Sequence, residues 1–484
     1  MTTAAWMEAL LVAPLSGAAI ALILGRRAAP VVGVVTALVS ASASIGLAFA
    51  VSRGGVLRYA VGGWGRPLGI DLYVDGLAAV MLTITGVVGA CISVCAVGYF
   101  APKPAAVGQA RGNTDPAWLF WPLWLMLWGG MNALYLSGDL FNIYVTQELI
   151  GLSGIGLIAL AGGSAIAAAL RYLLLALAGS LFYIVGVELL YAGYMTLDLQ
   201  QLRERVDANP STMVAAALMT AGLLAKSALF PLHFWLPPAH GHAPVPVSAA
   251  LSALVVKTGF YLVVRLWLQI LPGLAPQHLG ILFGVLGAAA VFWGGVQALM
   301  QERLKMMVAY STVAQVGYLF MLFPVASVPE ALPGALLLAA SHAAAKAALF
   351  MCAGSVLAVY GHDRIHSING FGARMPLTAV AFALSSISLI GLPPSGGFAG
   401  KWMLISAAFA AGAWWWAAII ALGGLLSAVY LFRVLSHAFL EPPIAGLGRA
   451  PWGMEVTSLV LALVAIGLNF AANPLHDLLK AGAG

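Results

Sequence analysis

Long apolar stretches recur along the whole chain and are separated by short polar segments. An α-helix needs about 20 predominantly apolar residues to cross the hydrocarbon core of a bilayer. A window of that length finds about fourteen such stretches, with approximate centres at Val12, Val39, Val87, Leu127, Leu149, Leu181, Leu218, Val256, Leu286, Leu319, Ala344, Leu389, Leu422 and Val464. They are too long for the strands of about 10 residues in a membrane β-barrel. The pattern therefore predicts an all-α integral membrane protein with about 14 transmembrane helices.

Two of the apolar stretches are interrupted by proline and glycine. One reads PLHFWLPP (residues 231–238) and the other reads GLPPSGGF (residues 391–398). Proline removes a backbone donor and clashes with the preceding turn, and broken backbone at membrane depth occurs where it is buried in protein or lines a cavity. Paired breaks in two halves of a chain point to inverted repeats around a central ion site.

The two breaks lie roughly five stretches apart, and an odd number of spans inverts the topology of a repeat. We therefore predict two inverted five-helix repeats, with helices 7 and 12 discontinuous. Helices 4 to 8 would occupy residues 117–272, and helices 9 to 13 residues 279–440. Helices 1 to 3 would precede them within residues 1–105, and helix 14 would follow at residues 452–472.

Composition leads to the same class of protein. The 484 residues are 62% hydrophobic and 8% charged, with a mean hydropathy of +0.99, whereas a soluble protein carries about 25% charged residues. A chain with so little charge cannot cover a water-facing surface. We therefore predict one membrane domain over residues 1–484, lying in a lipid bilayer.

The net charge of +6 comes from basic residues scattered through loops, so we predict no nucleic-acid partner. Basic residues favour cytoplasmic loops, and those that follow odd-numbered stretches are Arg26, Arg27, Lys103, Arg111, Arg171, Arg303, Lys305, Arg364, Arg374, Arg433 and Arg449. This excess predicts a multi-pass protein of the bacterial inner (plasma) membrane with both termini outside. The cluster Arg53, Arg58 and Arg66 argues the other way.

Five ionisable residues lie inside stretches that are otherwise apolar: Glu148, Lys226, Lys257, Lys346 and Lys401. An ionisable group at bilayer depth costs about 2.5–3.5 kcal/mol on insertion scales, and such residues usually mark ion or proton pathways. Five of them in one chain predict a route along which charge crosses the membrane.

Glu148 and Lys226 are candidates for an ion pair between helices. Glu148 lies about nine residues, or about 13 Å, beyond a span boundary at Gly138. Lys226 has no acidic residue within one helical turn, so its partner must come from another span. The alternatives are a Glu148 bonded to a local serine or asparagine, and a Lys226 that extends to an interface.

His342 and Lys346 are four residues apart and so share a helix face. Histidine titrates near physiological pH and suits a proton relay, although a lone buried histidine is more often structural. Lys257 and Lys401 complete the predicted route. Their alternatives are extension to an interface for Lys257 and a helix-start position near an interface for Lys401.

Three histidines crowd the first break: His233, His240 and His242. We set a metal site aside because no cysteine or acid joins them, and keep them as candidate accessory relays. The chain has no dinucleotide fingerprint, no cysteine cluster and no c-type haem motif. We therefore predict no cofactor, no metal and no catalytic redox residue, and a chain driven by an ion gradient or by partner subunits.

Four segments resemble the antiporter-like subunits of respiratory complex I. They are KSALFPLHFWLPPAH (226–240), APVPVSAALSALVVK (243–257), HAAAKAALF (342–350) and GLPPSGGFAGK (391–401). The same family includes the D-type component of Mrp-type multisubunit Na⁺/H⁺ antiporters and membrane subunits of energy-converting hydrogenases. The resemblance covers about residues 70–440. It implies fourteen helices in two inverted repeats and other membrane subunits as partners.

The resemblance also implies a hydrated charged axis across the midplane. The family's helix-five glutamate pairs with its helix-seven lysine, and the matching positions of the axis here are Glu148, Lys226, Lys257, His342, Lys346 and Lys401. The segment GDLFNIYV (138–145) is similar to the Mrp D type, which would exchange H⁺ for Na⁺ or K⁺. A proton-pumping subunit of NADH:quinone oxidoreductase or of a hydrogenase is the alternative. Many relatives have an acidic loop where this chain has PAHGH (238–242), which puts any role of those acids in doubt.

Overall fold

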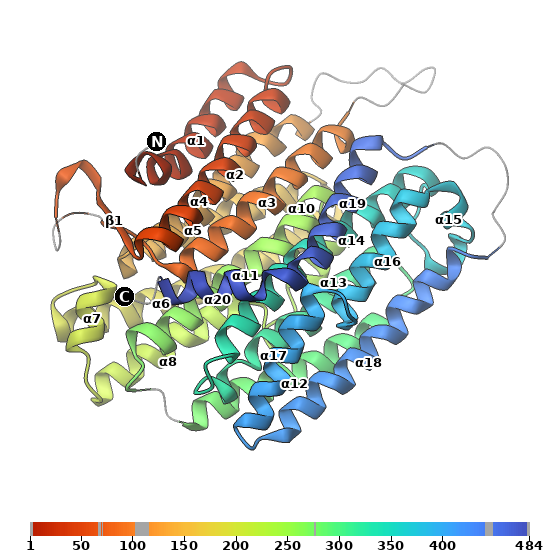
Figure 1. The fold of residues 1–484 in the computed structure, drawn as a ribbon. Helices are drawn as coiled ribbons and strands as arrows, with labels where there is room; N and C mark the ends of the chain where they lie inside the picture. The colour runs from red at the N-terminus through yellow and green to blue at the C-terminus, as the bar shows by residue number, and fades with distance from the viewer. Residues whose placement is uncertain are drawn as a thin grey trace.

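The computed structural model describes residues 3–65, 69, 71–101, 116–274, 277–440 and 449–481. The predicted loop charges Arg66, Lys103 and Arg111 lie outside this described part. Figure 1 shows a bundle of long helices that run roughly side by side. Within the described part, eleven helices are long and apolar enough to cross a membrane. The prediction of an all-α, multi-pass membrane fold is confirmed.

The eleven long spans include most of the predicted centres. They are α1 (Thr3–Leu24), α2 (Ala29–Gly54), α3 (Gly76–Tyr99), α5 (Leu140–Ala159), α6 (Ser164–Tyr194), the continuous helix Val245–Ile270, α12 (Gln277–Met300), α13 (Leu304–Phe320), α14 (Ala331–Tyr360), α18 (Trp414–His437), and α19 (Trp452–Gly467) with α20 (Ala472–Ala481).

The continuous helix Val245–Ile270 alternates between two windings. It comprises α10 (Val245–Ala250), the π turn η3 (Leu251–Val255), α11 (Val256–Val264) and the π turn η4 (Arg265–Ile270). Its most apolar stretch is entirely buried inside the protein. Because π turns inside helices are frequent at functional sites, both turns are candidates for functional polar contacts.

Both predicted breaks occur. The helix α8 (Pro210–Lys226) ends before the first proline-rich segment, and α9 (Leu236–His242) begins within its last three residues. The second break separates α16 (Pro376–Ile390) from α17 (Gly396–Ala410). Each half-helix alone is shorter than a full span. The helix α4 (Phe120–Leu136) is also just under this length.

Two predicted centres lie close to a helix end. Leu319 is one residue before the end of α13, because the apolar run continues into the short turn η5 (Phe323–Val325). Leu389 is one residue before the end of α16, because the apolar run continues past the break into α17. A hydropathy window averages over a break and places its centre there.

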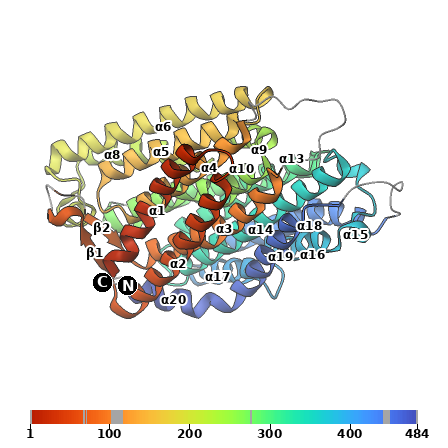
Figure 2. The same ribbon diagram turned by 90° about the horizontal axis from the view of Figure 1, so that it is seen from above.

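A short antiparallel hairpin was not predicted. It pairs β1 (Leu57–Ala60) with β2 (Asp71–Val74), with Leu57 opposite Val74. The end of the bundle that carries this hairpin is called the hairpin face below. Figure 2 shows the start of α1 and the end of α20 near the same face. The remaining short elements are η1 (Val61–Gly63), η2 (Pro116–Leu119), α7 (Leu199–Arg205), η6 (Ile365–Ser367), α15 (Phe371–Arg374) and η7 (Leu468–Ala471).

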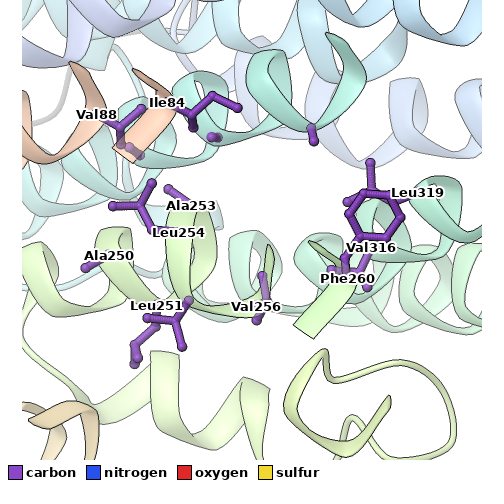
Figure 3. Close-up of a cluster of buried hydrophobic side chains, with 14 of the residues drawn as sticks. Ile84, Val88, Ala250, Leu251, Ala253, Leu254, Val256, Phe260, Val316 and Leu319 are labelled. Carbon is purple, nitrogen blue, oxygen red and sulfur yellow. The ribbon is translucent and has the colours of Figure 1, made fainter. Parts of the chain in front are cut away.

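The centre of the bundle is formed by α13, α14 and the continuous helix Val245–Ile270, whose side chains are almost all buried. Figure 3 shows apolar side chains of α3, the continuous helix and α13 meeting there, including Ile84, Leu254 and Val316. The outer helices α1, α6 and α18 instead expose many large apolar side chains. This arrangement places α13 and α14 away from lipid, where polar groups need partners from other helices.

Candidate functional site

Glu148 of α5 and Lys226 of α8 form an ion pair. The Lys226 Nζ lies 3.5 Å from Glu148 Oε1, and the two side chains are 13% and 27% exposed. The Ser180 hydroxyl of α6 donates to the same carboxylate oxygen. Lys226 is the last residue of α8, so its ammonium lies at the point where the broken helix ends.

Close packing of α6 against α8 brings Ser180 and Lys226 to the same carboxylate. Gly179 of α6 faces Gly222 of α8, and a Cβ added at Gly222 would lie 2.2 Å from the Gly179 carbonyl oxygen. Small residues allow such backbone approach between membrane helices. A side chain at either position would push the two helices apart and separate Glu148 from its partners.

Lys257 is fully buried in α11, and its ammonium donates to the Ser252 carbonyl of the π turn η3 at 3.0 Å. A small cavity lies between this region and the Glu148–Lys226 pair. Its lining includes Gln147, Lys226 and Thr258, the residue after Lys257. Lys226 and the helix that carries Lys257 therefore border the same small space, although the Lys257 side chain itself is not part of its lining.

A chain of hydrogen bonds leads from Ser252 to Lys346. The Ser252 hydroxyl is 2.8 Å from the Thr312 hydroxyl of α13, and Thr312 donates to the Val308 carbonyl at 3.1 Å. The Lys346 ammonium of α14 donates to the same carbonyl at 2.8 Å and to the Ser311 hydroxyl. Lys257 and Lys346 are thus linked through Ser252, whose carbonyl accepts from Lys257 and whose hydroxyl contacts Thr312.

The same face of α13 continues toward Lys401. One helical turn beyond Ser311, the Gln315 amide donates to the Leu389 carbonyl at 3.1 Å. The Lys401 ammonium donates to that carbonyl at 2.8 Å and to the Ile390 carbonyl at 3.0 Å. It also lies 4.2 Å from the centre of the Tyr318 ring, a distance at which a cation is attracted to the ring face.

Lys401 stabilises the second break. A helix that ends leaves its last carbonyl groups without intrahelical donors, and buried carbonyls need partners. Lys401 supplies them to the end of α16 from the opposite half-helix, α17. At the first break the indole of Trp235 donates to the Ala225 carbonyl at 3.1 Å.

Gly391→Ala should disturb Lys401 selectively. Gly391 has φ +90°, and an added Cβ would lie 2.8 Å from Cδ of Lys401. A left-handed backbone costs an alanine about 1–2 kcal/mol, and the methyl group should displace the ammonium. We expect a lower unfolding temperature and slower transport.

Gly412→Ala provides the matched control for this change. Gly412 also has a left-handed φ, +69°, but nothing lies within 4 Å of its added Cβ. The control should lower the unfolding temperature alone. Equal transport rates in the two variants would show that contact with Lys401 does not matter.

His342 lies one turn before Lys346 on α14 and is fully buried. Among the described residues, neither of its ring nitrogens has a hydrogen-bond partner. A buried polar atom without a partner is costly. Both ring nitrogens therefore remain available to bind a proton or a water molecule. The structure therefore leaves the predicted relay role of His342 untested.

His342→Gln tests that role. Glutamine has a similar size and hydrogen-bonding capacity but does not titrate near neutral pH. If His342 relays protons, turnover should fall about 100-fold and its pH dependence should change. Coincident pH–activity curves for the wild-type protein and His342→Gln would remove His342 from the pathway.

The three histidines of the first break lie in different environments. His233 stacks on Phe230, with ring centroids 5.4 Å apart. His240 is buried beside Phe350, at 5.1 Å, and neither ring nitrogen has a partner in the described part. His242 is exposed, and its Nδ1 lies 2.9 Å from the Pro238 carbonyl oxygen. The described residues contain no group of three or more ligand-type side chains that could hold a metal.

Comparisons with known proteins identify the family of this chain. The family described as NADH:quinone oxidoreductase/Mrp antiporter, TM, matches residues 137–427, which include every residue of the axis. The chain belongs to this family. It is 38% identical over 407 residues to NADH-quinone oxidoreductase subunit N of Desulforudis audaxviator, covering 83% of this chain and 79% of the relative.

A second relative comes from an antiporter. The chain is 31% identical over 446 residues to the D-type component of the Na(+)/H(+) antiporter of Alkalihalophilus pseudofirmus, covering 90% of this chain and 87% of the relative. The structure of the chain also superposes on a chain of the Mrp complex from Dietzia sp. DQ12-45-1b with a TM-score of 0.88 and 25% identity. That match covers 99% of this chain and 97% of the other.

Sequence reasoning missed several polar residues of this family member. Lys305, counted above as a loop residue, lies in the first turn of α13, is buried, and donates to the Ala243 carbonyl. It lines a cavity that also includes His242 and the end of α3, on the face opposite the hairpin. The polar face of α13 was also missed, although Ser311 and Gln315 are spaced one turn apart and share a helix face.

Proposed function

We propose that the chain is a proton-translocating subunit of a multisubunit membrane complex, most similar in role to the D-type component of a Mrp-type monovalent cation/H⁺ antiporter. The observation that carries the proposal is the series of polar contacts from Glu148 to Lys401 through the buried centre of the bundle. A purely structural subunit would not need this series, because each buried charge is costly. Its partners are other membrane subunits, and its transported ions are H⁺ and either Na⁺ or K⁺.

In this mechanism the Glu148–Lys226 pair controls the first step. While the pair is closed, the carboxylate stabilises the charged form of Lys226. When the pair opens, Lys226 loses that partner and its proton moves toward Lys257 by way of the small cavity that Lys226 and Thr258 line. Water chains complete the route when the axis is hydrated.

The next steps use the two kinds of oxygen along α13 differently. A hydroxyl both donates and accepts, so Ser252, Thr312 and Ser311 are able to pass a proton. A backbone carbonyl only accepts, so the carbonyls of Val308 and Leu389 position a lysine amine but cannot pass a proton. The proton would pass from Lys257 to Lys346, with His342 beside it, and leave near Lys401.

The second candidate is a proton-pumping subunit of NADH:quinone oxidoreductase or of an energy-converting hydrogenase, in which redox reactions in partner subunits drive the same axis. The higher identity to the subunit N relative favours it. Co-purification distinguishes the two candidates. Small Mrp-type membrane subunits would support the first, and flavin and iron–sulfur subunits would support the second.

The proposed topology has fourteen spans. Adding α4 and the two discontinuous helices α8/α9 and α16/α17 to the eleven long spans supports this count. We propose that residues 117–272 and 279–440 are the two inverted repeats, and that both termini and the hairpin face lie outside a bacterial inner membrane. The two breaks, each near an intramembrane lysine, support the repeats.

The experiment that tests the function is ion exchange in everted vesicles. The chain is expressed with the genes that neighbour its own in a host without its own Na⁺/H⁺ antiporters. A respiratory pH gradient is formed, and Na⁺ or K⁺ is then added. We expect the cation to collapse the gradient in these vesicles and not in vesicles that lack this chain. The absence of any cation effect, together with redox-driven proton uptake, would support the second candidate instead.

A further inference from the structure

The hairpin face contains a charged vestibule. Its lining combines β1 and β2, the start of α3, α7 and the π turn η4. Three acidic and three basic side chains contribute: Asp71, Asp75, Asp198, Arg58, Arg203 and Arg265. The opposite charges are equal in number, so the vestibule is polar without selecting strongly for ions of one sign.

A buried ion pair forms the floor of this vestibule. Arg265 Nη2 donates to Asp75 Oδ1 at 2.7 Å, and Nη1 contacts the other carboxylate oxygen. Arg265 Nε donates to the Tyr261 hydroxyl at 2.9 Å, and the Gln269 amide donates to Asp75 at 3.3 Å. Asp75 also caps α3 by accepting from the Ala78 amide at 2.9 Å. The side chains of Arg265 and Asp75 are only 4% and 3% exposed.

Arg265 separates two spaces. Besides the vestibule, it lines a second, small and mainly apolar cavity whose other walls include Ile143 of α5, Leu223 of α8 and Leu262 of α11. Arg265 and the residues packed around it form the wall between this second cavity and the vestibule. The guanidinium is therefore placed between water at the hairpin face and the interior.

The second cavity leads toward the Glu148–Lys226 pair. The cavity that contains Lys226 is lined by Gln147 of α5, Lys226 of α8 and Thr258 of α11. Each of these residues is three or four positions along its helix from a residue of the second cavity, which is about one turn, or about 5.4 Å. Three helices thus line two successive cavities between Arg265 and the ion pair.

We infer that the Asp75–Arg265 pair is a gate that closes an aqueous access route from the hairpin face to the Glu148–Lys226 pair. Separating a buried ion pair without new partners is strongly unfavourable, so the closed state is the resting one. Asp71 and Asp198 place further carboxylates in the vestibule lining, and in the open state the guanidinium would turn toward them. Such a turn would connect the vestibule with the second cavity.

This inference rests on the proposed function for the destination of the route, whereas its test measures access and not transport. Leu223→Cys places a thiol in the second cavity, in a chain whose cysteines Cys91, Cys95 and Cys352 are replaced by serine. Ag⁺ is small enough to follow a narrow aqueous route. Its rate of reaction is measured as the loss of later maleimide labelling after denaturation.

Asp75→Asn opens the gate in this test. Asparagine remains a good helix N-cap, so the variant removes the charge of the pair while it keeps the cap of α3. The thiol of Leu223→Cys should react on the order of tenfold faster or more, because its exposure follows the open population. The acceleration should occur only when Ag⁺ is added at the hairpin face.

Ala290→Cys on α12 is the control for general loosening, because Ala290 is fully buried and lines neither cavity. Its reactivity should not change with Asp75→Asn, and an equal acceleration at both sites would overturn the gate. If Asp75→Asn does not accumulate in the membrane, Arg265→Lys replaces it, because lysine keeps the charge and loses the two-pronged contact. An unchanged rate at Leu223→Cys would also overturn the inference, whereas inactive Glu148 or Lys226 variants bear only on the proposed function.

Discussion

Glu148→Ala and Lys226→Ala should each abolish ion exchange while the protein still inserts into the membrane. Either change leaves one charge of the 3.5 Å pair without its partner. The step that the pair controls should slow by about 100-fold or more, the range of a lost acid–base group. The pH gradient in everted vesicles measures the rate, and immunoblotting measures the amount of protein.

The double variant tests whether the two residues act together. Groups that act as one unit are not additive, so the variant that lacks both should be no slower than Lys226→Ala alone. Glu188→Ala is the matched control, because Glu188 is an exposed acidic residue of α6 outside the axis. Normal exchange by either single variant would contradict the proposed role of the pair.

Lys401→Ala should block exchange as completely, for two reasons. The change removes a charge from the end of the axis, and it removes the donor to the carbonyls of Leu389 and Ile390 at the second break. Lys401→Glu should keep part of the rate, because a titratable group remains. Lys401→Met keeps the length without a charge and should be inactive. Wild-type exchange by Lys401→Ala would show that the buried Lys401 takes no part in ion exchange.

The charged axis could be predicted from the sequence because its residues are ionisable whereas the residues around them are apolar. A lysine within about twenty apolar residues is energetically unfavourable unless it lies in the protein interior or reaches an interface. Lys257 and Lys346 are therefore easy to identify in the sequence. The breaks were equally visible, because proline and glycine interrupt a pattern that otherwise continues through the membrane. The structure places both breaks within a few residues of the predicted segments.

The contacts between these residues could not be predicted. Thr312 and Ser311 are common residues in any helix, and their roles follow only from the packing of α13 against α14 and the continuous helix. The carbonyls of Val308 and Leu389 leave no signal in the sequence, because every residue has one. The location of such acceptors depends on which helix ends or turns beside them.

The Asp75–Arg265 pair was overlooked for a different reason. Arg265 lies in an apolar stretch eight residues after Lys257, so the same rule that identified the lysines applies to it. Asp75 follows the hairpin and has the position of an ordinary helix cap. Only the fold brings the two together across 190 residues.

The most direct test of the account is proton movement by the purified complex in proteoliposomes, with Lys257 or with methionine at that position. Lys257 is the fully buried centre of the axis, and Lys257→Met nearly keeps its volume while it removes the charge. A pH-sensitive dye inside the vesicles reports protons after a Na⁺ or K⁺ gradient is imposed. The account predicts rapid cation-driven proton movement by the wild-type complex and none above empty vesicles by Lys257→Met. Equal proton movement by the two complexes would contradict it.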